Sequence, residues 1–588
     1  MKTDRIKSLL SALFSGKPDG CRNTGIISSA ISLFLLCTQI FAAEEPLFRV
    51  GIMTDTHIRN DRSSCRLCRC AFETFKAAGV DLIVNLGDIA DRHYPEGYRH
   101  YREIYNEVFS DQGKKPRDLI IYANHDQLGI GNWEKACRLL KKRIAASNDP
   151  YDQLEIKGYP ILIFPEFMDS ERYRKTIEAA GKKYPGRPII IFDHAPACDT
   201  IAGTAFWGCK VRRKILNQFP SAIHITGHTH GSLQNEQNIW QGDFTAVNAG
   251  CLSIWKGKLI GYAPEPKGNT GVLIMEVFPS KILFRRYDAV TRQEYRPDRP
   301  WTVPLPFAKE NAPYRLSARK NGAPCFPDNA ELKLSAEQWN SSRLLLKFPA
   351  ARHPDRTYRY RFDIEENDGV NRWRKIAVTE RFGDFYLPEK QQKSRMVYPV
   401  STGYFSPEKK YRISVFPINF YEETGSPLIA ELLAPPSPQD WETVFESRNP
   451  MDECPFYAGL QGKTKTARKD GFYQKSSWIH RLIFPDQVWN APTGTEYRFI
   501  IDVRTRGTWQ MVLRQIKPKF FPCERLYTPN EEKSPLRYIM EFTQQGRHNY
   551  CLQVHGVENA EIRFEYLRIE RKKNRAADTA PKTAETAD

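Results

Sequence analysis

The sequence predicts an α/β domain with a buried sheet in its N-terminal half, followed by two all-β domains. Between residues 48 and 226, short apolar runs alternate with helix-like stretches, a pattern typical of buried strands joined by helices. From about residue 312 the pattern changes to short alternating runs without a helical signal, which is typical of β-sandwiches. Two proline-rich stretches, near Pro304 and Pro436, are interpreted as linkers.

Length and charge set limits on what the chain does. With 588 residues it exceeds one hydrophobic core and predicts several structural units. The formal net charge of +18 favours anionic partners, such as a phosphorylated substrate or an anionic surface. Lys and Arg are scattered along the chain and not gathered in one run, so we do not expect a nucleic-acid partner.

The N-terminus predicts export. Residues 1–43 combine basic residues with an apolar stretch that starts at Gly25, and they are interpreted as a signal peptide or an N-terminal membrane anchor. Either outcome places the rest of the chain in an extracytoplasmic location, in the periplasm, on the cell surface or in the medium. Membrane contact is expected only through this segment, if it is not cleaved.

Five apolar runs, at residues 48–53, 81–86, 119–122, 189–192 and 222–226, lead into polar motifs. The motifs are, in order, Asp55-Thr56-His57, Gly87-Asp88, Asn124-His125-Asp126, Asp193-His194 and Gly227-His228-Thr229-His230. The carboxyl ends of strands in open α/β sheets converge on one crevice, so we expect the motifs to meet. Each motif alone is a weak signal, because a lone Gly-Asp is usually a turn and a lone His is usually a structural residue. The ordered set is specific.

This ordered set resembles the calcineurin-like metallophosphoesterase family, over roughly residues 46–290. The resemblance implies a sandwich of two mixed β-sheets flanked by helices, assigned to residues 46–300. The alternating apolar residues at 272–277 and 282–284 are interpreted as the closing strands of the second sheet. It also implies two divalent or trivalent cations, Mn, Fe or Zn, because carboxylate oxygen and neutral imidazole are the ligands that such cations prefer.

The resemblance implies a role for each motif residue. The first cation would be held by Asp55, His57, Asp88 and His230, and the second by Asp88, Asn124, His194 and His228. A hydroxide that bridges the two cations would attack phosphorus. His125 would be the general acid, oriented and charged by Asp126.

Several other residues near the motifs remain open. Ala123 stands where the family usually has glycine, which implies a different local backbone but removes no ligand. Three residues that follow the motifs closely are candidate substrate contacts: Arg59, Arg92 and His93. Two acidic residues beside the motifs are candidates for orienting the ligating imidazoles: Asp91 and Asp193.

Cysteine usage is compatible with export. Cys65, Cys68 and Cys70 are spaced as on a helix that packs small thiols, an interpretation favoured over a metal site. Candidate disulfides are a bridge between Cys198 and Cys209, and one bridge among Cys454, Cys523 and Cys551.

The C-terminal half is divided into three parts by its patterns. Residues 310–436 resemble a fibronectin type III-like β-sandwich, and residues 439–573 resemble a jelly-roll, galactose-binding-like β-sandwich. Residues 574–588 lack aromatics and are expected to be a disordered tail. Candidate sugar-stacking residues, for which burial in the core is favoured instead, are Trp478, Trp489 and Trp509.

The leading functional hypothesis is an exported dinuclear-metal phosphoesterase that acts on a phosphomonoester or a phosphodiester, either small or surface-bound. The alternatives are a metal-dependent nuclease and a surface carbohydrate-binding protein with an accessory phosphoesterase domain. No metal motif follows His230, so we expect the chemistry to lie before about residue 305 and the C-terminal half to serve in recruitment. The alternative is that the fibronectin-like module packs over the crevice and completes the substrate pocket.

Overall fold

The computed structural model describes most of the chain. The described ranges are residues 44–59, 62–90, 96–127, 138, 151–253, 270–335, 343–370, 372–387, 391–434, 441–454, 456–458, 464–465, 468–474, 480–507, 509–515, 522–528, 531–544, 550–556 and 560–573. The predicted export segment and the predicted tail lie outside these ranges.

The first sheet of the N-terminal domain is mixed. Its strand order is β12-β11-β10-β1-β2-β3, and β13 also pairs with β11, along residues 281–284, on the side where β12 pairs with residues 286–287. β10 and β11 therefore belong to the sheet of β1, and their assignment to the second sheet is wrong. β1, β2 and β3 run parallel, whereas the strands from β10 onward pair antiparallel. The strands are β1 (Phe48–Met53), β2 (Leu82–Asn85), β3 (Arg117–Ile120), β10 (Gly271–Val277), β11 (Lys281–Asp288), β12 (Glu294–Tyr295) and β13 (Trp301–Pro304).

The second sheet is also mixed, with the order β4-β5-β6-β7-β9-β8. Its central strands β5, β6, β7 and β9 run parallel, and β4 and β8 pair antiparallel at its edges. The strands are β4 (Gln153–Ile156), β5 (Tyr159–Ile163), β6 (Ile189–Phe192), β7 (Ala222–Thr226), β8 (Ile239–Gln241) and β9 (Thr245–Asn248).

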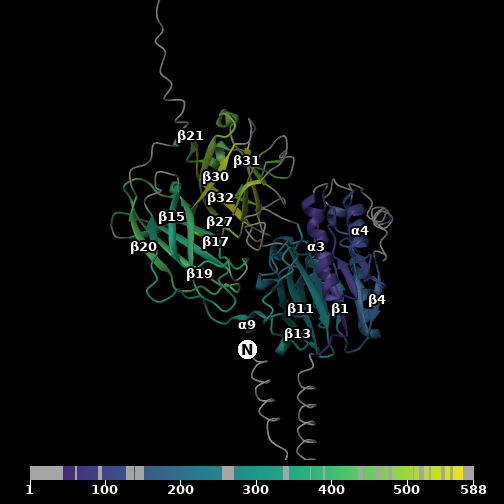
Figure 1. Ribbon diagram of the computed structural model, residues 1–588. Helices are drawn as coiled ribbons and strands as arrows, with labels where there is room; N and C mark the ends of the chain where they lie inside the picture. Colours follow the sequence, from purple (N-terminus) through teal and green to yellow (C-terminus); the bar gives the residue numbers. More distant parts are fainter. Residues whose placement is uncertain are drawn as a thin grey trace, which may run out of the picture. The chain divides into compact units, whose positions relative to one another are not determined.

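The two sheets pack face to face and helices cover their outer faces. One core joins Ile52 and Val84 of the first sheet to Ile190 and Ile225 of the second. Helices α3 (Arg62–Ala78) and α4 (Glu96–Val108) cover the first sheet (Figure 1). Helices α6 (Ser170–Lys183) and α8 (Lys210–Leu216) cover the second. The predicted α/β sandwich of two mixed sheets is therefore confirmed.

Helix α3 also explains the three clustered cysteines. Cys68, Phe72 and Phe75 are fully buried and lie on one face at helical spacing. Burial raises the pKa of the Cys68 thiol well above its usual value, as expected for a packed and unreactive cysteine.

One proline-rich segment differs from the expectation of a linker. Trp301 and Val303 are buried, and residues 301–304 pair with residues 281–284 of β11 as an edge strand. Proline is tolerated here because it sits at the end of an edge strand, where no ladder hydrogen bond is lost. The first sheet thus extends to Pro304, a few residues beyond the predicted boundary at 300.

The region after α9 (Leu316–Arg319) is all-β. A three-stranded sheet, β14-β15-β18, and a four-stranded sheet, β17-β16-β19-β20, share a core that includes Phe348 and Phe362; we call this unit the first sandwich. Its strands are β14 (Lys333–Ser335), β15 (Arg343–Pro349), β16 (Arg359–Asn367), β17 (Trp373–Phe382), β18 (Arg395–Ser401), β19 (Lys410–Ile418) and β20 (Leu428–Leu433). The fibronectin type III-like assignment stays a prediction.

The second sandwich consists of two six-stranded sheets, and Figure 1 shows β27, β30 and β32 side by side in one of them. Phe499 and Leu552 come from opposite sheets and share one core. The longer strands are β21 (Trp441–Ser447), β26 (His480–Ile483), β27 (Glu496–Arg506), β28 (Trp509–Gln515), β29 (Pro522–Thr528), β30 (Glu531–Thr543), β31 (Tyr550–Gly556) and β32 (Glu561–Lys572). The all-β prediction for the C-terminal half is confirmed.

Two side-chain expectations are settled in this part of the chain. Trp489 and Trp509 are buried in the core of the second sandwich and so offer no sugar-stacking face, whereas Trp478 lies outside the described residues. Cys198, Cys209 and Cys454 are free thiols, so neither the Cys198–Cys209 bridge nor a bridge to Cys454 forms, and a bridge between Cys523 and Cys551 stays a prediction. The loop at Cys198 is instead closed by backbone hydrogen bonds, Cys198 N to Cys209 O at 3.3 Å and Cys209 N to Pro196 O at 2.7 Å.

Candidate metal centre

The five motifs meet at the carboxyl ends of strands from both sheets. The motifs of the first sheet follow β1, β2 and β3, and those of the second follow β6 and β7. Backbone hydrogen bonds tie the motifs together within each sheet, from Asp55 N to Gly87 O at 3.0 Å and from Gly227 N to His194 O at 3.2 Å. The convergence follows from the parallel direction of these strands.

Asp55, His57 and His230 form the first group of donors, with one ligand atom of each lying within 4.8 Å of the others. The Oδ1 atom of Asp55 lies 3.0 Å from Nε2 of His230 and 3.8 Å from Nε2 of His57. The other oxygen, Oδ2, accepts hydrogen bonds from Thr54 Oγ1 at 2.8 Å and from His228 N at 3.0 Å. One oxygen of Asp55 is therefore fixed by the protein, and the other faces two imidazoles.

Asp88 occupies the position between the two predicted sites. Its Oδ2 atom lies 3.8 Å from Nε2 of His57 and 3.5 Å from Nε2 of His194. Its Oδ1 atom accepts a hydrogen bond from His125 N at 2.9 Å, which fixes the orientation of the carboxylate. A single oxygen thus faces a ligand of each predicted cation, as a bridging carboxylate requires.

The second group contains His194, His228 and Asn124. Nε2 of His194 lies 3.2 Å from Nδ1 of His228. Nδ1 of His194 lies 2.9 Å from the carbonyl of Leu86, which only accepts, so this nitrogen carries a hydrogen and Nε2 is the atom directed at the site. Burial would lower the pKa of His194, but the carboxylate of Asp88 outweighs it and raises the pKa well above its usual value, so a cation that binds Nε2 would displace a proton. Among the described residues, the buried Oδ1 of Asn124 has no hydrogen-bond partner, as expected for an oxygen reserved for a ligand.

Backbone strain is concentrated at these ligands. Five of the predicted ligands have a positive φ angle, between 41° and 68°, namely Asp55, His57, Asp88, His228 and His230. Such angles are uncommon for residues with a Cβ and cost about 1–3 kcal/mol each, so they persist only where the surrounding structure enforces them. These loops therefore adopt unfavourable backbone angles that bring the side chains of the predicted ligands together.

The unusual Ala123 is accommodated by Gly87. A Cβ added to Gly87 would lie 2.5 Å from the Cβ of Ala123 and 3.3 Å from Nδ1 of His194. Gly87 has φ +104°, and Ala123 itself is fully buried without a positive φ. The absence of a side chain at 87 thus leaves room for the methyl group at 123.

The charges of the cluster depend on one another. Burial would raise the pKa values of Asp55 and Asp88, but the imidazoles of His230 and His194 respectively outweigh it and hold both pKa values below their usual range. Burial lowers the pKa values of His57 and His228 to about 4, so both are neutral at pH 7. Neutral imidazoles and ionised carboxylates are the forms that bind cations.

His125 and Asp126 lie at the site in different ways. His125 belongs to a donor group with His57 and Asp88, and its ring packs edge-on to that of His57 at 4.8 Å. Asp126 accepts hydrogen bonds from the backbone N–H groups of Asp88, Ile89 and Ala123 and from the hydroxyl of Tyr98. Asp126 thereby braces the Asp88 loop; its expected role as the orienter of His125 stays a prediction.

The remaining candidates are only partly described. Arg59 is exposed. Asp193 is fully buried and accepts a hydrogen bond from Arg212 Nε at 2.8 Å, and Nε2 of His224 lies 3.6 Å from the same carboxylate. These contacts fix the residue that precedes His194. The candidates outside the described residues are Asp91, Arg92 and His93.

Two residues at the site, Cys251 and Glu166, do not belong to any of the five motifs. Cys251 follows β9, and its Sγ lies 3.1 Å from Nδ1 of His230. Glu166 follows β5, and burial raises its pKa to about 7; among the described residues its Oε2 has no hydrogen-bond partner. Their positions just after predicted strands could have revealed both residues. β5 and β9 are parallel strands, and their carboxyl ends lie at the same edge of the sheet as the motifs.

Comparison with known proteins agrees with this geometry. The model of the calcineurin-like phosphoesterase family matches residues 48–232. No curated protein matches the chain. Among solved structures, a dimetal phosphatase from Danio rerio is 11% identical and covers 45% of this chain and 100% of its own, with a TM-score of 0.32.

Two further structures are similar to different shares of the chain. A Bacteroides uniformis β-glucuronidase is 10% identical and covers 89% of this chain and 57% of its own, with a TM-score of 0.19. The CBM22-1–GH10 modules of a Clostridium thermocellum endo-1,4-β-D-xylanase, complexed with xylohexaose, are 14% identical over 23% of this chain and 26% of their own, with a TM-score of 0.15.

Proposed function

We propose that the chain is an exported, metal-dependent phosphoester hydrolase acting on a phosphomonoester or phosphodiester, because the calcineurin-like phosphoesterase family model matches residues 48–232. The observation that carries the proposal is the position of Asp88, whose Oδ2 faces His57 and His194 together. An isolated structural carboxylate needs no such pair of imidazoles.

The donor set fits two cations. Asp55, His57 and His230 form one donor group, Asp88 forms another with Asp55 and His194, and His228 lies 3.2 Å from His194. Asn124 supplies a buried amide oxygen. When bound, two cations in such a site lower the pKa of water toward neutrality and neutralise charge on the phosphoryl oxygens. Asn, His and carboxylate ligands accept Mn, Fe or Zn according to supply.

His125 is the group of this chain best placed to move a proton. Its backbone N–H is held by Asp88 Oδ1 at 2.9 Å, and its half-buried ring lies beside that of His57. An imidazole in this position protonates a leaving alkoxide, a contribution typically of about 10²–10⁴-fold. Esters with a poor leaving group therefore depend on His125 more than nitrophenyl esters do.

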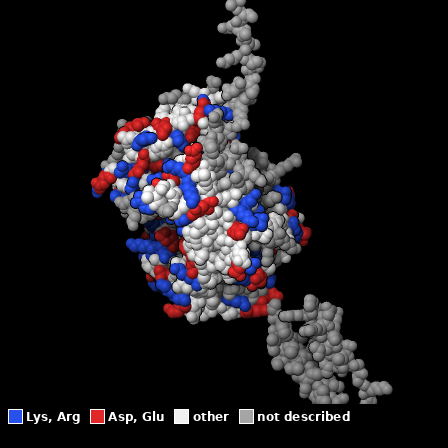
Figure 2. Space-filling view, turned by 90° about the vertical axis from the view of Figure 1, so that its left-hand side faces the viewer, with Lys and Arg blue, Asp and Glu red and all other residues white. Residues whose placement is uncertain are grey.

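Charge and location complete the proposal. Figure 2 shows Lys and Arg side chains interspersed with Asp and Glu on the face it draws, a distribution that suits a small or surface-bound phosphoester better than a long polyanion. No helix within the described ranges is long and apolar enough to span a bilayer. Export is supported by the sequence of residues 1–43 alone.

A substrate panel tests the proposal. Purified protein loaded with Mn²⁺, Zn²⁺ or Fe is assayed against nitrophenyl phosphate, bis-nitrophenyl phosphate, cyclic nucleotides and phospholipid headgroups. We expect hydrolysis of at least one ester, loss of activity on chelation, and a larger fall in kcat for His125→Ala with poor leaving groups. Hydrolysis that survives chelation, or that is confined to nucleic acid, would overturn the proposed function.

A further inference from the structure

The segment that follows the last metal motif is held along its length. Residues 231–238, here called loop 231–238, connect His230 to β8. Asn238 Nδ2 donates to Ser232 O at 2.7 Å, and a Cβ on Gly231 would lie 2.6 Å from the same nitrogen. Asn238 therefore packs against the residue next to His230. The loop ends in the short 3-10 helix η2 (Glu236–Asn238).

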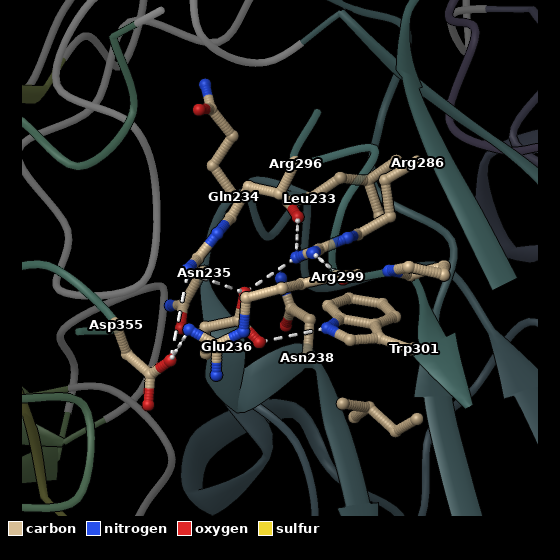
Figure 3. A network of polar contacts seen from close by, with 12 residues as sticks. Leu233, Gln234, Asn235, Glu236, Asn238, Arg286, Arg296, Arg299, Trp301 and Asp355 are labelled. Atoms are coloured by element: carbon tan, nitrogen blue, oxygen red, sulfur yellow. Dashed lines mark hydrogen bonds and ion pairs between the residues drawn. The ribbon is translucent and has the colours of Figure 1, made fainter. Parts of the chain in front are cut away.

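Glu236 anchors this loop as a buried anion (Figure 3). Its carboxylate accepts hydrogen bonds from Arg286 Nη1 at 2.8 Å, Trp301 Nε1 at 3.0 Å and Arg319 Nη2 at 3.1 Å. Burial would raise the pKa of Glu236, but the guanidinium groups of Arg286 and Arg319 outweigh it and hold the pKa at about 2. Removing one partner of a buried ion pair such as Glu236–Arg286 is costly because it leaves an uncompensated charge.

Part of the anchor comes from beyond the catalytic sheets. Arg319 lies at the end of α9 and also donates to the backbone carbonyls of Glu236 and Ile239, at 2.7 and 3.1 Å. Arg356, in the first sandwich, donates to Gln234 Oε1 at 3.2 Å. Gln234 in turn donates through Nε2 to the carbonyl of Tyr386, another residue of the first sandwich.

We propose that the first sandwich and the preceding helix α9 are positioning elements of the metal centre, which act through Arg356 and Arg319 on loop 231–238 and so fix His228 and His230. This inference rests on the proposed metal sites. It assigns the sandwich a role in shaping the centre, in place of a role in recruitment only.

The strain at the motif gives the physical reason. His228 and His230 have φ angles of 68° and 53°, and such angles relax unless neighbouring structure enforces them. On the upstream side the motif continues from β7, and Asn248 Nδ2 donates to Thr229 Oγ1 at 2.8 Å. On the downstream side the restraint is loop 231–238, so a weakened anchor allows His230 to leave the geometry that faces Asp55.

The experiment uses the full chain with Arg356→Ala and Glu236→Gln. Mn²⁺ affinity is measured by titration calorimetry, and amide hydrogen exchange is followed in peptides that cover residues 227–238. We expect the Kd for Mn²⁺ to rise about 10-fold, the usual size of the effect when a residue that orients ligands is removed. Exchange in residues 227–238 should become faster, and kcat for a small ester should fall with little change in KM.

Arg372→Ala is the matched control, because Arg372 is an arginine of the same sandwich whose partner Asp368 lies at 2.8 Å and whose side chain is 82% exposed. It should keep the wild-type Mn²⁺ affinity and exchange pattern. If Arg356→Ala also keeps the wild-type Mn²⁺ affinity and exchange pattern, even with a lower Tm, the contact contributes only to stability and the proposal fails. Arg356→Ala decides the matter if Glu236→Gln does not fold.

These readouts separate the two proposals. Variants that lose Mn²⁺ affinity in a chain that hydrolyses no phosphoester support the positioning role and overturn the proposed function. A wild-type chain that binds no Mn²⁺ overturns both.

Discussion

The two oxygens of Asp88 have different surroundings, and this asymmetry decides what the residue does. Oδ1 is occupied by the backbone N–H of His125, so only Oδ2 is directed between His57 and His194. Oδ1 of Asp55 also faces two imidazoles, but His57 and His230 belong to the same predicted site. The two imidazoles near Oδ2 of Asp88 belong to different predicted sites, and this distinguishes Asp88 from Asp55.

Asp88→Asn is expected to weaken both metal sites together. An amide presents one neutral oxygen in place of a charged carboxylate, and it cannot neutralise two cations. His228→Ala should instead remove one cation and leave the other. Metal content per chain, measured by plasma mass spectrometry after dialysis, gives the comparison, and two metals retained in Asp88→Asn would exclude the bridge.

Cys251 is the expected partner of His230. When Nε2 of His230 faces a cation, Nδ1 carries the hydrogen, and Cys251 Sγ lies 3.1 Å from it. Cys251→Ala removes this acceptor and should lower metal affinity about 10-fold, whereas Cys251→Ser keeps an acceptor and should restore most of it. Equal losses in the two variants, measured by calorimetry, would assign Cys251 a packing role only.

At the scale of the element, the loops after the strands depend on glycine where a side chain would displace a ligand. Gly87 joins β2 to Asp88, and a Cβ at this position would lie 2.5 Å from the Cβ of Ala123. Its φ of +104° lies outside the range that alanine tolerates well. The loop geometry and the close approach together leave only glycine at this position.

Gly87→Ala should therefore cost more than the same change at Gly79. Both glycines have positive φ angles, but a Cβ at Gly79 would meet nothing within 4 Å. Gly79→Ala is expected to cost about 1–2 kcal/mol from backbone conformation alone. Gly87→Ala adds about 1–3 kcal/mol of overpacking and should also reduce metal content. Urea unfolding of the two variants tests the difference, and equal costs would contradict it.

For the whole molecule, the buried anchor at Glu236 makes stability depend on acid pH. Its folded pKa of about 2 lies below the ordinary value of 4.5, so its stabilising contribution is complete above pH 4.5 and is lost as the pH falls through 2. The shift corresponds to about 3 kcal/mol. The difference in Tm between wild type and Glu236→Gln should be largest near neutrality and shrink below pH 4.5. A difference that grows toward low pH would contradict the pairing.

Export is tested by fractionation. Expressed in a bacterial host with its N-terminus intact, the chain is expected outside the cytoplasm, released or anchored, because residues 1–43 combine basic residues with an apolar stretch. A chain that lacks residues 1–43 is the control and should stay in the cytoplasm. Full-length protein found only in the soluble cytoplasm would rule out export.

The division of labour between the catalytic domain and the C-terminal half differs from the one that the sequence favours. The last metal motif in the sequence ends at His230, and this favours recruitment as the role of the later residues. Arg319 and Arg356 contact the loop that follows His230, and neither belongs to a motif. Contacts of this kind join residues far apart in the chain, so local patterns do not reveal them.

What the sequence determined by itself is the order of strands and ligands. The apolar runs before Asp55, Asp88 and His228 match β1, β2 and β7 closely, because buried parallel strands must be apolar along their whole length. The tertiary structure alone decided which oxygen of Asp88 faces both sites, that Cys251 lies against His230, and that Trp301 belongs to a strand. These features depend on distances between segments that are remote in sequence, and composition and periodicity carry no information about such distances.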